Sequence, residues 1–272
     1  MIRRKERDGV VVIGGYGAVG RTVCTGLAQR FPGRVFAAGR NMKKAEAFSR
    51  ETGRKILPFE LDLGDLSRAA RALDGARLVV ACAETGDTSF ARACLERGIH
   101  YVDVSASYAF LREVERLDAL AREHRATGVL SVGLVPGLTN LLAKRCAQVL
   151  DSVRSLDISV LLGLGGAHGE AAVRWTALVA LLSRLQLGSE GFSVKVEAEG
   201  AVDGYPSTYS GSVSGRGEGY ATGIVAALVA ERLYAAPCER GVLHVEQLFD
   251  PSAMFDQITA HGLTVALDPP PR

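Results

Sequence analysis

Residues Val10–Gly20 read VVVIGGYGAVG, and this stretch decides the fold. Its first four residues form a short apolar run, as expected of a strand that is buried on both faces. The glycines match the pattern G-x-G-x-x-G, and apolar residues at helical spacing then run from Ala18 to about Arg30. A glycine-rich turn between a buried strand and a helix is the context in which this pattern indicates dinucleotide binding.

The three glycines of this loop have separate expected roles. Gly15 makes the tight turn, Gly17 lets the backbone approach a pyrophosphate, and Gly20 lets the helix pack on the strand. The free N–H groups at the helix N-terminus then bind the phosphates. The predicted cofactor loop consists of Gly15, Tyr16, Gly17, Ala18, Val19 and Gly20. The alternative is a glycine-rich turn in a fold that binds nothing.

Strand-like and helix-like segments alternate through the first half of the chain. Strands are predicted at Val10–Ile13, Arg34–Ala38, Lys55–Leu61, Leu78–Ala81, Ile99–Val104 and Gly128–Val132. Helices are predicted between them at Ala18–Arg30, Met42–Thr52, Leu66–Asp74, Ser89–Arg97 and Phe110–Arg125. Because the connections are short, this alternation calls for a parallel sheet with helices on both faces. We therefore expect residues 1–138 to form an α/β domain of the Rossmann type, with a doubly wound parallel sheet.

The residues after the second predicted strand indicate which nicotinamide cofactor binds. NAD enzymes usually place an acidic residue there, about 20 residues past the glycine motif, and its carboxylate would repel a 2′-phosphate. This chain has Arg40 and Asn41 instead, with Lys43 and Lys44 one turn further on. An arginine can form paired hydrogen bonds to phosphate and stack on adenine. The sequence therefore predicts NADP(H) as the cofactor; the alternative is that Arg40 is a solvated surface residue.

Further cofactor contacts follow from where the predicted strands end. Asp62 follows the third strand and is placed to meet the adenine edge, or else to cap the helix that begins near Leu66. The fourth strand ends in Ala81, Cys82 and Ala83, at the carboxyl edge where such sheets bind ligands. Small side chains there permit close approach of the nicotinamide ribose. Cys82 is interpreted as a small packing residue rather than a nucleophile.

The bulk composition excludes several classes of protein. The chain has 272 residues, of which 47% are hydrophobic and 23% charged, so a globular protein is expected. A net charge of +2 argues against general nucleic-acid binding and gives no electrostatic reason to expect a membrane surface. No apolar run approaches the roughly 18 residues that span a bilayer, and no signal peptide is recognised. The five cysteines are irregularly spaced and do not cluster with histidines, which indicates reduced thiols in a cytoplasmic protein and no metal site.

Four further stretches, taken with the glycine loop, carry a resemblance to a known family. They are Gly98–Asp103 (GIHYVD), Gly133–Asn140 (GLVPGLTN), Tyr220–Gly223 (YATG) and Gly241–Leu243 (GVL). In these stretches the chain resembles the saccharopine dehydrogenase-like (saccharopine reductase) family. The resemblance implies an NAD(P)-dependent oxidoreductase that acts on C–N bonds of amino acids or polyamines. The chain departs from the family in having only about 80 residues between Asn140 and Tyr220, where the substrate domain is usually much larger, so no substrate contact is carried over.

The second half is predicted to hold a small antiparallel sheet with one or two helices. Strands are predicted at Leu156–Leu162, Phe192–Ala198, Tyr205–Ser214 and Gly262–Leu267, and helices at Asn140–Leu150, Glu170–Leu187 and Thr222–Leu233. We expect residues 139–219 to form a smaller α+β domain for substrate binding and dimerisation, and residues 220–272 to return to the first domain. The second half is apolar and its sheet has edges that need covering, which favours a homodimer.

Candidate catalytic residues lie at predicted loop ends. Asp103 ends the fifth strand and is placed to stabilise a cationic iminium; the alternative is capping or structural support. Tyr108 and His168 are candidate proton donors, and a plain surface-loop residue is the alternative for His168. Asn140 and Trp175 are candidates for shaping the substrate pocket, with core packing as the alternative for Trp175. No tyrosine has a lysine four positions on, which argues against a typical short-chain reductase.

These observations predict an NADP-dependent oxidoreductase that reduces an imine (C=N) of an amino-acid- or amine-derived small molecule. An iminium can arrive already protonated, so the lack of an obvious acid–base pair fits this reaction. Reduction of a C=C or C=O bond is a second possibility, because more distant family members include enoyl reductases. A non-catalytic protein that senses NADP is a third. The second glycine cluster, Gly163–Gly169, favours an enzyme because a sensor needs no substrate pocket.

Overall fold

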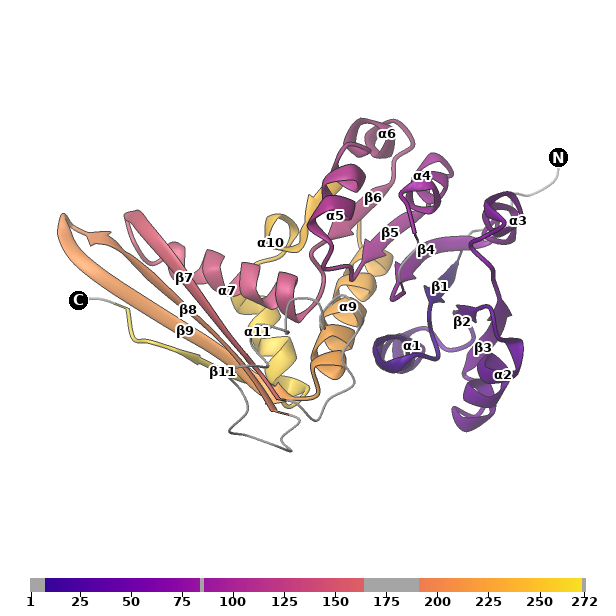
Figure 1. Ribbon diagram of the computed structural model, residues 1–272, viewed down its shortest axis with the longest axis horizontal. Coiled ribbons are helices and arrows are strands. Elements are labelled where there is room, and N and C mark those ends of the chain that lie inside the picture. The colour runs from indigo at the N-terminus through magenta and orange to yellow at the C-terminus, as the bar shows by residue number, and fades with distance from the viewer. Residues whose placement is uncertain (1–7, 84–85, 164–190, 271–272) are drawn as a thin grey trace. The chain divides into compact units, whose positions relative to one another are not determined.

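The computed structural model describes residues 8–83, 86–163 and 191–270 (Figure 1). The chain forms two compact units. The first contains the residues up to Val132 together with Ala226–His244, and the second contains Gly133–Val225 together with Val245–Arg272. Each unit is built on a sheet of its own, so the two are described separately.

The first unit is built on a seven-stranded sheet in which all paired neighbours are parallel. Its strands are β1 (Gly9–Ile13), β2 (Val35–Gly39), β3 (Ile56–Glu60), β4 (Ala76–Ala81), β5 (His100–Asp103), β6 (Thr127–Leu130) and β10 (Gly241–His244). In space they follow the order β10-β6-β5-β4-β1-β2-β3. The strand order reverses between β1 and β4. Doubly wound sheets bind ligands at such a reversal, beside the carboxyl ends of the strands.

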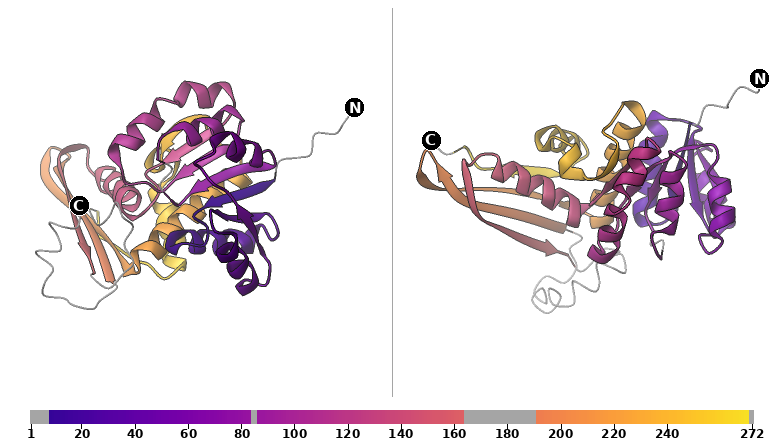
Figure 2. Two further views of the ribbon diagram at one scale, coloured as in Figure 1. Left: turned by 45° about the vertical axis from the view of Figure 1, so that its right-hand side comes forward. Right: turned by 90° about the horizontal axis from the view of Figure 1, so that it is seen from above.

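Helices cover both faces of this sheet (Figure 2). They are α1 (Ala18–Arg30), α2 (Met42–Glu51), α3 (Leu66–Ala72), α4 (Ser89–Glu96), α5 (Tyr108–Glu115), α6 (Asp118–Glu123) and the second part of α9 (Glu218–Ala235). On one face, strand residues such as Val79 share a buried core with Phe90 of α4 and Leu111 of α5. Helices α1 and α9 are neighbours, because the rings of Phe31, at the end of α1, and Tyr234, on α9, have centroids 4.2 Å apart.

The predicted doubly wound α/β fold is confirmed. Strand β1 is buried at every position, as expected of a strand that is covered on both faces. The predicted helix Phe110–Arg125 is instead two helices, α5 and α6, because the chain turns between them and buries Leu117 in the core. Strand β10, which the sequence marked only as part of a family motif, pairs with β6 and extends the sheet.

The second unit is an antiparallel sheet of four strands in the order β11-β9-β8-β7. Its strands are β7 (Ser152–Leu162), β8 (Gly191–Val202), β9 (Tyr205–Arg216) and β11 (Thr264–Leu267). A short turn, η1 (Leu134–Leu138), leads into α7 (Thr139–Ala147), which packs on one face of the sheet (Figure 1). Val194 and Val196 of β8 are fully buried there. The helices α10 (Val245–Leu248) and α11 (Pro251–Ala260) also pack against α7.

All four strands that the sequence predicts in the second half are present, and β7, β8 and β9 are longer than predicted. Strands β8 and β9 are joined through Asp203 and Gly204, which both have positive φ, as in a two-residue hairpin turn. The predicted helix Glu170–Leu187 lies outside the described residues. No helix of the described part of the chain is long and apolar enough to cross a membrane.

The two units divide the chain differently from the expected boundaries. Residues 133–138 belong to the second unit, because η1 packs against α7. Of the segment 220–272, which we expected to return to the first domain, Ala226–His244 does so. Residues 245–272 belong to the second unit instead, because β11 pairs with β9 and α11 packs on α7.

Candidate active site

The glycine loop joins β1 to α1 through the tight turn that the sequence predicts. The backbone N–H of Gly17 donates to the carbonyl oxygen of Gly14 at 2.8 Å. A Cβ atom at Gly15 would lie 2.7 Å from the Cα of Ala37, and one at Gly20 would lie 2.2 Å from the carbonyl oxygen of Gly14. Any larger residue at Gly15 or Gly20 would therefore collide with backbone, as the predicted roles of these two glycines require.

Gly17 differs from the other two, because a Cβ atom there would meet only the carbonyl oxygen of Gly14, at 3.2 Å. It is the N-cap of α1, and no side chain caps the first N–H groups of that helix. The first turn, which begins with Ala18 and Val19, contains no acidic residue. A helix N-terminus with free N–H groups and no carboxylate favours phosphate. The loop therefore fits the pyrophosphate of a dinucleotide.

Tyr16, inside the glycine motif, reaches the end of β2. Its hydroxyl accepts a hydrogen bond from the backbone N–H of Asn41 at 3.0 Å, and a Cβ atom at Gly39 would lie 2.3 Å from that hydroxyl oxygen. Asn41 caps α2, because its side-chain oxygen accepts from the backbone N–H of Lys44 at 3.0 Å. Arg40 is exposed and makes no ion pair with any described residue. Its guanidinium is therefore available to a phosphate.

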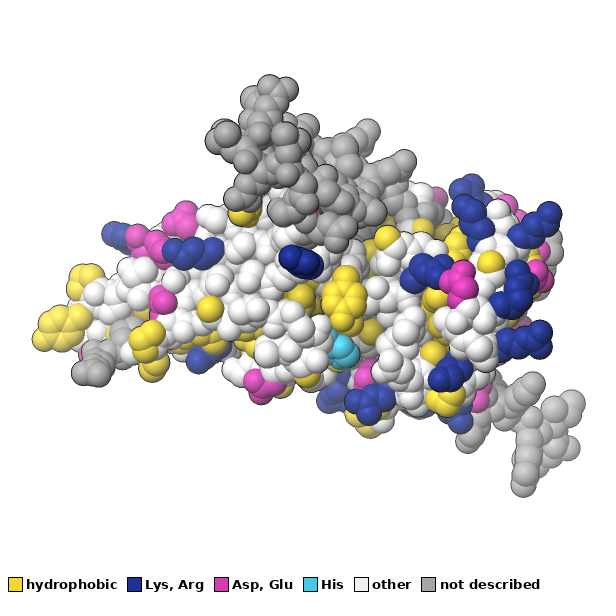
Figure 3. Space-filling model, turned by 90° about the horizontal axis from the view of Figure 1, so that it is seen from below, with side chains coloured by type: hydrophobic (Ala, Val, Ile, Leu, Met, Phe, Trp, Pro, Cys, Tyr) yellow, Lys and Arg dark blue, Asp and Glu magenta, His cyan; other side chains and the backbone are white. Residues whose placement is uncertain are grey.

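Basic side chains gather around this end of the first unit. Figure 3 shows Lys and Arg side chains, with some Asp and Glu side chains among them, at the right-hand end of this view. Lys43 and Lys44, in the first turn of α2, are both exposed. A 2′-phosphate bound after β2 would meet a positive potential there, which is the electrostatic condition for preferring NADP(H) over NAD(H).

The ends of β3 and β4 flank the glycine loop. Asp62 is exposed, and its Oδ1 accepts from the backbone N–H of Gly64 at 3.0 Å, so its side chain forms a local turn before α3 rather than the helix cap that was the alternative to an adenine contact. At the end of β4, a Cβ atom on Gly14 would lie 3.0 Å from the Cβ of Ala83. The residues Ala81, Cys82 and Ala83 thus run directly beside the loop, as predicted from the topology.

The thiol of Cys82 is not a nucleophile at neutral pH. Burial, together with the nearby carboxylate of Asp103, raises the pKa of Cys82 well above its ordinary value of 9.0. A protonated, half-buried thiol behaves as a small apolar group. This agrees with the interpretation of Cys82 as a packing residue.

Asp103 is the buried acid of this region, with a side chain only 3% exposed. It ends β5 beside Ala81, the last residue of β4. The Tyr101 hydroxyl donates to its Oδ2 at 2.5 Å, and the backbone N–H of Ser105 donates to its Oδ1 at 2.6 Å. Burial raises the pKa of Asp103 from 3.8 to about 6, while the bonds from Tyr101 and Ser105 act to lower it. Its carboxylate is therefore ionised at neutral pH, held in one orientation, and able to stabilise a cation.

The other predicted catalytic and substrate residues either make local hydrogen bonds or lie outside the described residues. Tyr108, in the first turn of α5, is 71% exposed and accepts a hydrogen bond from Arg112 at 3.0 Å. Asn140, in α7, accepts from the backbone N–H of Gly137 at 3.3 Å and so stabilises the turn η1 of the second unit. His168 and Trp175 lie outside the described residues.

One group of polar residues at the carboxyl edge was not predicted. His244, the last residue of β10, makes hydrogen bonds to the Ser131 Oγ at 2.7 Å through Nδ1 and to Glu115 Oε1 at 2.6 Å through Nε2. Ser131 follows β6 with a φ of 55° and is almost fully buried. These residues lie at the ends of three elements that are far apart in sequence, so no local sequence pattern predicts that they meet.

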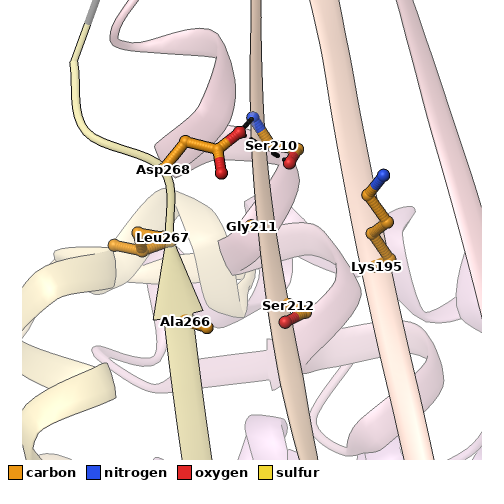
Figure 4. Close-up of a pocket in the computed structure, with 7 residues that line it drawn as sticks. All are labelled: Lys195, Ser210, Gly211, Ser212, Ala266, Leu267 and Asp268. Carbon is orange, nitrogen blue, oxygen red and sulfur yellow. Dashed lines mark hydrogen bonds between the residues drawn. The ribbon is translucent and has the colours of Figure 1, made fainter.

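A small hollow lies on the sheet of the second unit (Figure 4). It is lined by Lys195, Ser210, Gly211, Ser212, Ala266, Leu267 and Asp268. Its volume of about 130 Å³ is well below the roughly 300–1,000 Å³ of pockets that bind small molecules. Its charged side chains are also engaged, because Lys195 pairs with Glu197 and Asp268 accepts from Ser210. The hollow therefore has neither the size nor the free polar groups of a substrate pocket.

Comparisons with known proteins agree with this geometry. Residues 10–131 match the family described as "Saccharopine dehydrogenase NADP binding domain". The fold resembles apo saccharopine dehydrogenase (L-Glu forming) from Saccharomyces cerevisiae, with a TM-score of 0.69 and 12% identity over 96% of this chain and 100% of that chain.

Two further solved structures share the fold. DAP dehydrogenase from C. glutamicum, in complex with DAP, has a TM-score of 0.53 and 12% identity over 89% of this chain and 94% of that chain. An engineered D-amino acid dehydrogenase bound to NADP+ has a TM-score of 0.53 and 14% identity over 92% of this chain and 98% of that chain. With the glycine loop and the basic end of β2, the family match leads to one conclusion: residues 10–131 form an NADP-binding domain of the saccharopine dehydrogenase type, the cofactor domain of an NAD(P)-dependent oxidoreductase.

Proposed function

We propose that this protein reduces an imine, or the corresponding iminium, formed from an amino acid or another amine, with NADPH as the reductant. The observation that carries the proposal is the buried, oriented carboxylate of Asp103 beside the end of β4. Bound NADPH supplies the hydride. A carboxylate next to the reacting carbon would stabilise an iminium cation, whereas it would oppose the negative charge that develops when a ketone or enone is reduced.

The three related structures support a C–N bond as the target. They are a saccharopine dehydrogenase that forms L-Glu, a DAP dehydrogenase and a D-amino acid dehydrogenase, so at least two of them act on or form an amino acid. The proposed substrate is therefore a small molecule that carries an amino group after reduction. Within the proposal, Tyr108 and His168 remain candidates for handling the proton, and Asn140 and Trp175 remain candidates for contacting the substrate.

The test is NADPH oxidation by the purified protein against matched panels of amine–carbonyl pairs, enones and ketones. The proposal expects turnover only with amine–carbonyl pairs, and expects Asp103→Asn to lower kcat while NADPH affinity is unchanged. Turnover of enones or ketones alone would establish a C=C or C=O reductase instead. NADPH binding with no turnover on any panel would favour a sensor of NADP.

We further propose that the protein is a homodimer in which strand β7 packs against the same strand of a second copy. One side of β7 presents only apolar residues: Val153, Leu156, Ile158, Val160 and Leu162. Val196 of β8 pairs with Ile158 and is fully buried. On β7, by contrast, Ile158 is 49% exposed and Leu156 is 42% exposed. An edge strand with an open apolar face is a liability that association removes.

All five cysteines are free, which supports the reducing, cytoplasmic setting that the sequence suggests.

A further inference from the structure

The edge of the first sheet opposite the glycine loop carries a group of basic residues. Arg77 lies near the start of β4, His100 begins β5, and Arg240 immediately precedes β10. The register places Leu78 beside His100 and Gly241 beside Thr127, so these strands start side by side. The three basic residues therefore lie at the amino ends of β4, β5 and β10, at one edge of the parallel sheet, with β6 between β5 and β10.

One ring N–H group of His100 has no hydrogen-bond acceptor among the described residues. The backbone N–H of Thr127 donates to the His100 Nδ1 at 3.1 Å, so Nδ1 is the unprotonated nitrogen and the ring hydrogen is on Nε2. The nearest polar neighbour of that Nε2 is a guanidinium nitrogen of Arg240 at 3.5 Å, which is also a donor. If the ring hydrogen were on Nδ1 instead, that N–H group would face the N–H of Thr127, so two donors would again meet. An acceptor placed between His100 and Arg240 would satisfy both N–H groups.

The positive charge at this edge is not neutralised by the described carboxylates. Neither Arg77 nor Arg240 makes an ion pair with a described residue, and Glu239, next to Arg240, pairs with Arg122 at 3.8 Å. Burial, and after it the charges of Arg240 and Arg77, lowers the pKa of His100 from 6.5 to about 4, while the hydrogen bond from Thr127 acts to raise it. The positive charges of both guanidinium groups therefore disfavour protonation of the imidazole. The ring is neutral at neutral pH, and its N–H group still lacks an acceptor.

The aromatic surroundings hold Arg77 in place. Its guanidinium carbon lies 4.9 Å from the ring centroid of Tyr234. The Tyr234 hydroxyl is itself fixed, because it accepts from Arg34 at 3.0 Å and donates to the carbonyl oxygen of Asp8 at 2.9 Å. A guanidinium that is positioned in advance loses less freedom when it binds an anion.

We propose that Arg77, His100 and Arg240 form a binding site for an oxyanion group, the shared chemistry of phosphate esters and carboxylates. An anionic oxygen there would accept from the His100 Nε2–H and from Arg240, while Arg77 supplies a second charge. The site lies at the amino ends of the strands, away from the glycine loop at their carboxyl ends, so it goes beyond the proposed reaction. Its ligand is an effector rather than the cofactor or the substrate.

The test titrates inorganic phosphate, and separately citrate, into the full-length protein with saturating NADP+, so that the glycine loop is already occupied. The imidazole nitrogen resonances of His100 report binding by NMR, with chloride at matched ionic strength as the control. Arg77→Gln and Arg240→Gln should each weaken binding of the responding anion roughly tenfold, the loss expected for one charge-assisted hydrogen bond. Arg92→Gln, which removes a surface arginine paired with Glu96 on α4, should bind as the wild type does.

A response to phosphate alone would identify a phosphorylated ligand, and a response to citrate alone would identify a carboxylate ligand; either supports the site. The proposal is overturned if His100 responds to neither anion, if chloride gives the same response, or if both arginine variants bind as tightly as the Arg92→Gln control.

Discussion

The hydroxyl of Tyr101 donates a hydrogen bond to the carboxylate of Asp103 at 2.5 Å, two residues further along β5, and both side chains are buried. With the N–H of Ser105 on the other oxygen, this bond opposes the burial that raises the pKa of Asp103 to about 6. The balance keeps a buried acid ionised at neutral pH, as an iminium-stabilising group must be.

Replacing Tyr101 with Phe removes that bond and keeps the ring. We expect the pKa of Asp103 to rise from about 6 by roughly one to two further units, since a hydrogen bond to a charged group contributes about 1.5–3 kcal/mol. The carboxyl carbon resonance of Asp103, followed by NMR against pH, measures the shift. Tyr209→Phe, which changes another buried tyrosine in the second unit, is the control and should leave the Asp103 titration unchanged. An unaltered pKa in Tyr101→Phe would show that burial alone sets it.

Asp103 also predicts how stability depends on pH. The unfolded chain releases the Asp103 proton near pH 3.8, whereas the folded protein keeps it up to about pH 6. The folded state therefore binds more protons in that window, and stability falls as pH rises through it, by on the order of 3 kcal/mol.

His100 acts in the opposite direction. The unfolded chain takes up a proton below about pH 6.5, whereas folded His100 stays neutral down to about pH 4, so stability rises with pH over that window by a similar amount. In the wild type the two effects largely cancel between pH 4 and 6. We expect urea unfolding of Asp103→Asn to show stability rising with pH there, and that of His100→Gln to show it falling. Parallel profiles for the two variants would contradict both assignments.

Local rules account for what the sequence predicts well. The glycine loop is recognisable because each constraint acts within a few residues, as between Gly20 and the carbonyl of Gly14. Asp103 was identified from its place at a strand end, but its partner Tyr101 was missed. The i, i+2 spacing that puts both side chains on one face of β5 was the available signal.

Long-range pairs were beyond the sequence. His244 contacts Ser131 across 113 positions and Glu115 across 129, and nothing near His244 in the chain indicates either partner. The division into units also depends on distant pairing, since β11 joins the second unit through β9. The break between α5 and α6 has no proline or glycine to mark it. It is set by the burial of Leu117, a property of the packed core.

The glycine loop allows packing and cofactor binding to be separated. Gly20→Ala places a Cβ atom 2.2 Å from a backbone oxygen, so we expect it to destabilise the protein by about 1–3 kcal/mol or more. Gly17→Ala adds a Cβ atom with a single close contact, 3.2 Å from the carbonyl oxygen of Gly14, and fills the approach to the helix N-terminus, so we expect a small fall in Tm and a large loss of NADPH affinity. Calorimetric Tm and NADPH titration measure the two effects. Gly75→Ala, where a Cβ atom meets nothing within 4 Å, should change neither; equal NADPH affinity in Gly17→Ala and the wild type would contradict the assigned role of Gly17.

The link between Ser131 and His244 should matter for stability. Ser131→Ala removes the hydroxyl partner of the partly buried His244 Nδ1, so we expect a cost of about 1 kcal/mol. Because Ser131 follows β6 and His244 ends β10, hydrogen exchange should speed up first in the amides of β10. Ser212→Ala, on the open face of the other sheet, provides the comparison. If exchange in β10 is as slow in Ser131→Ala as in that control, the bond does not anchor the strand.

The apolar side of β7 tests the proposed homodimer. A lysine at Ile158 puts a charge in the middle of the open apolar face, so we expect Ile158→Lys to be monomeric by sedimentation at concentrations where the wild type is a dimer. Ser159→Lys adds the same charge on the opposite side of the same strand and should remain dimeric. Since both positions lie within one strand that pairs only with β8 among the described residues, a general weakening of the sheet would affect them alike. Dissociation of both variants would place the interface on the strand edge rather than on its apolar face, and a monomeric wild type would exclude the dimer.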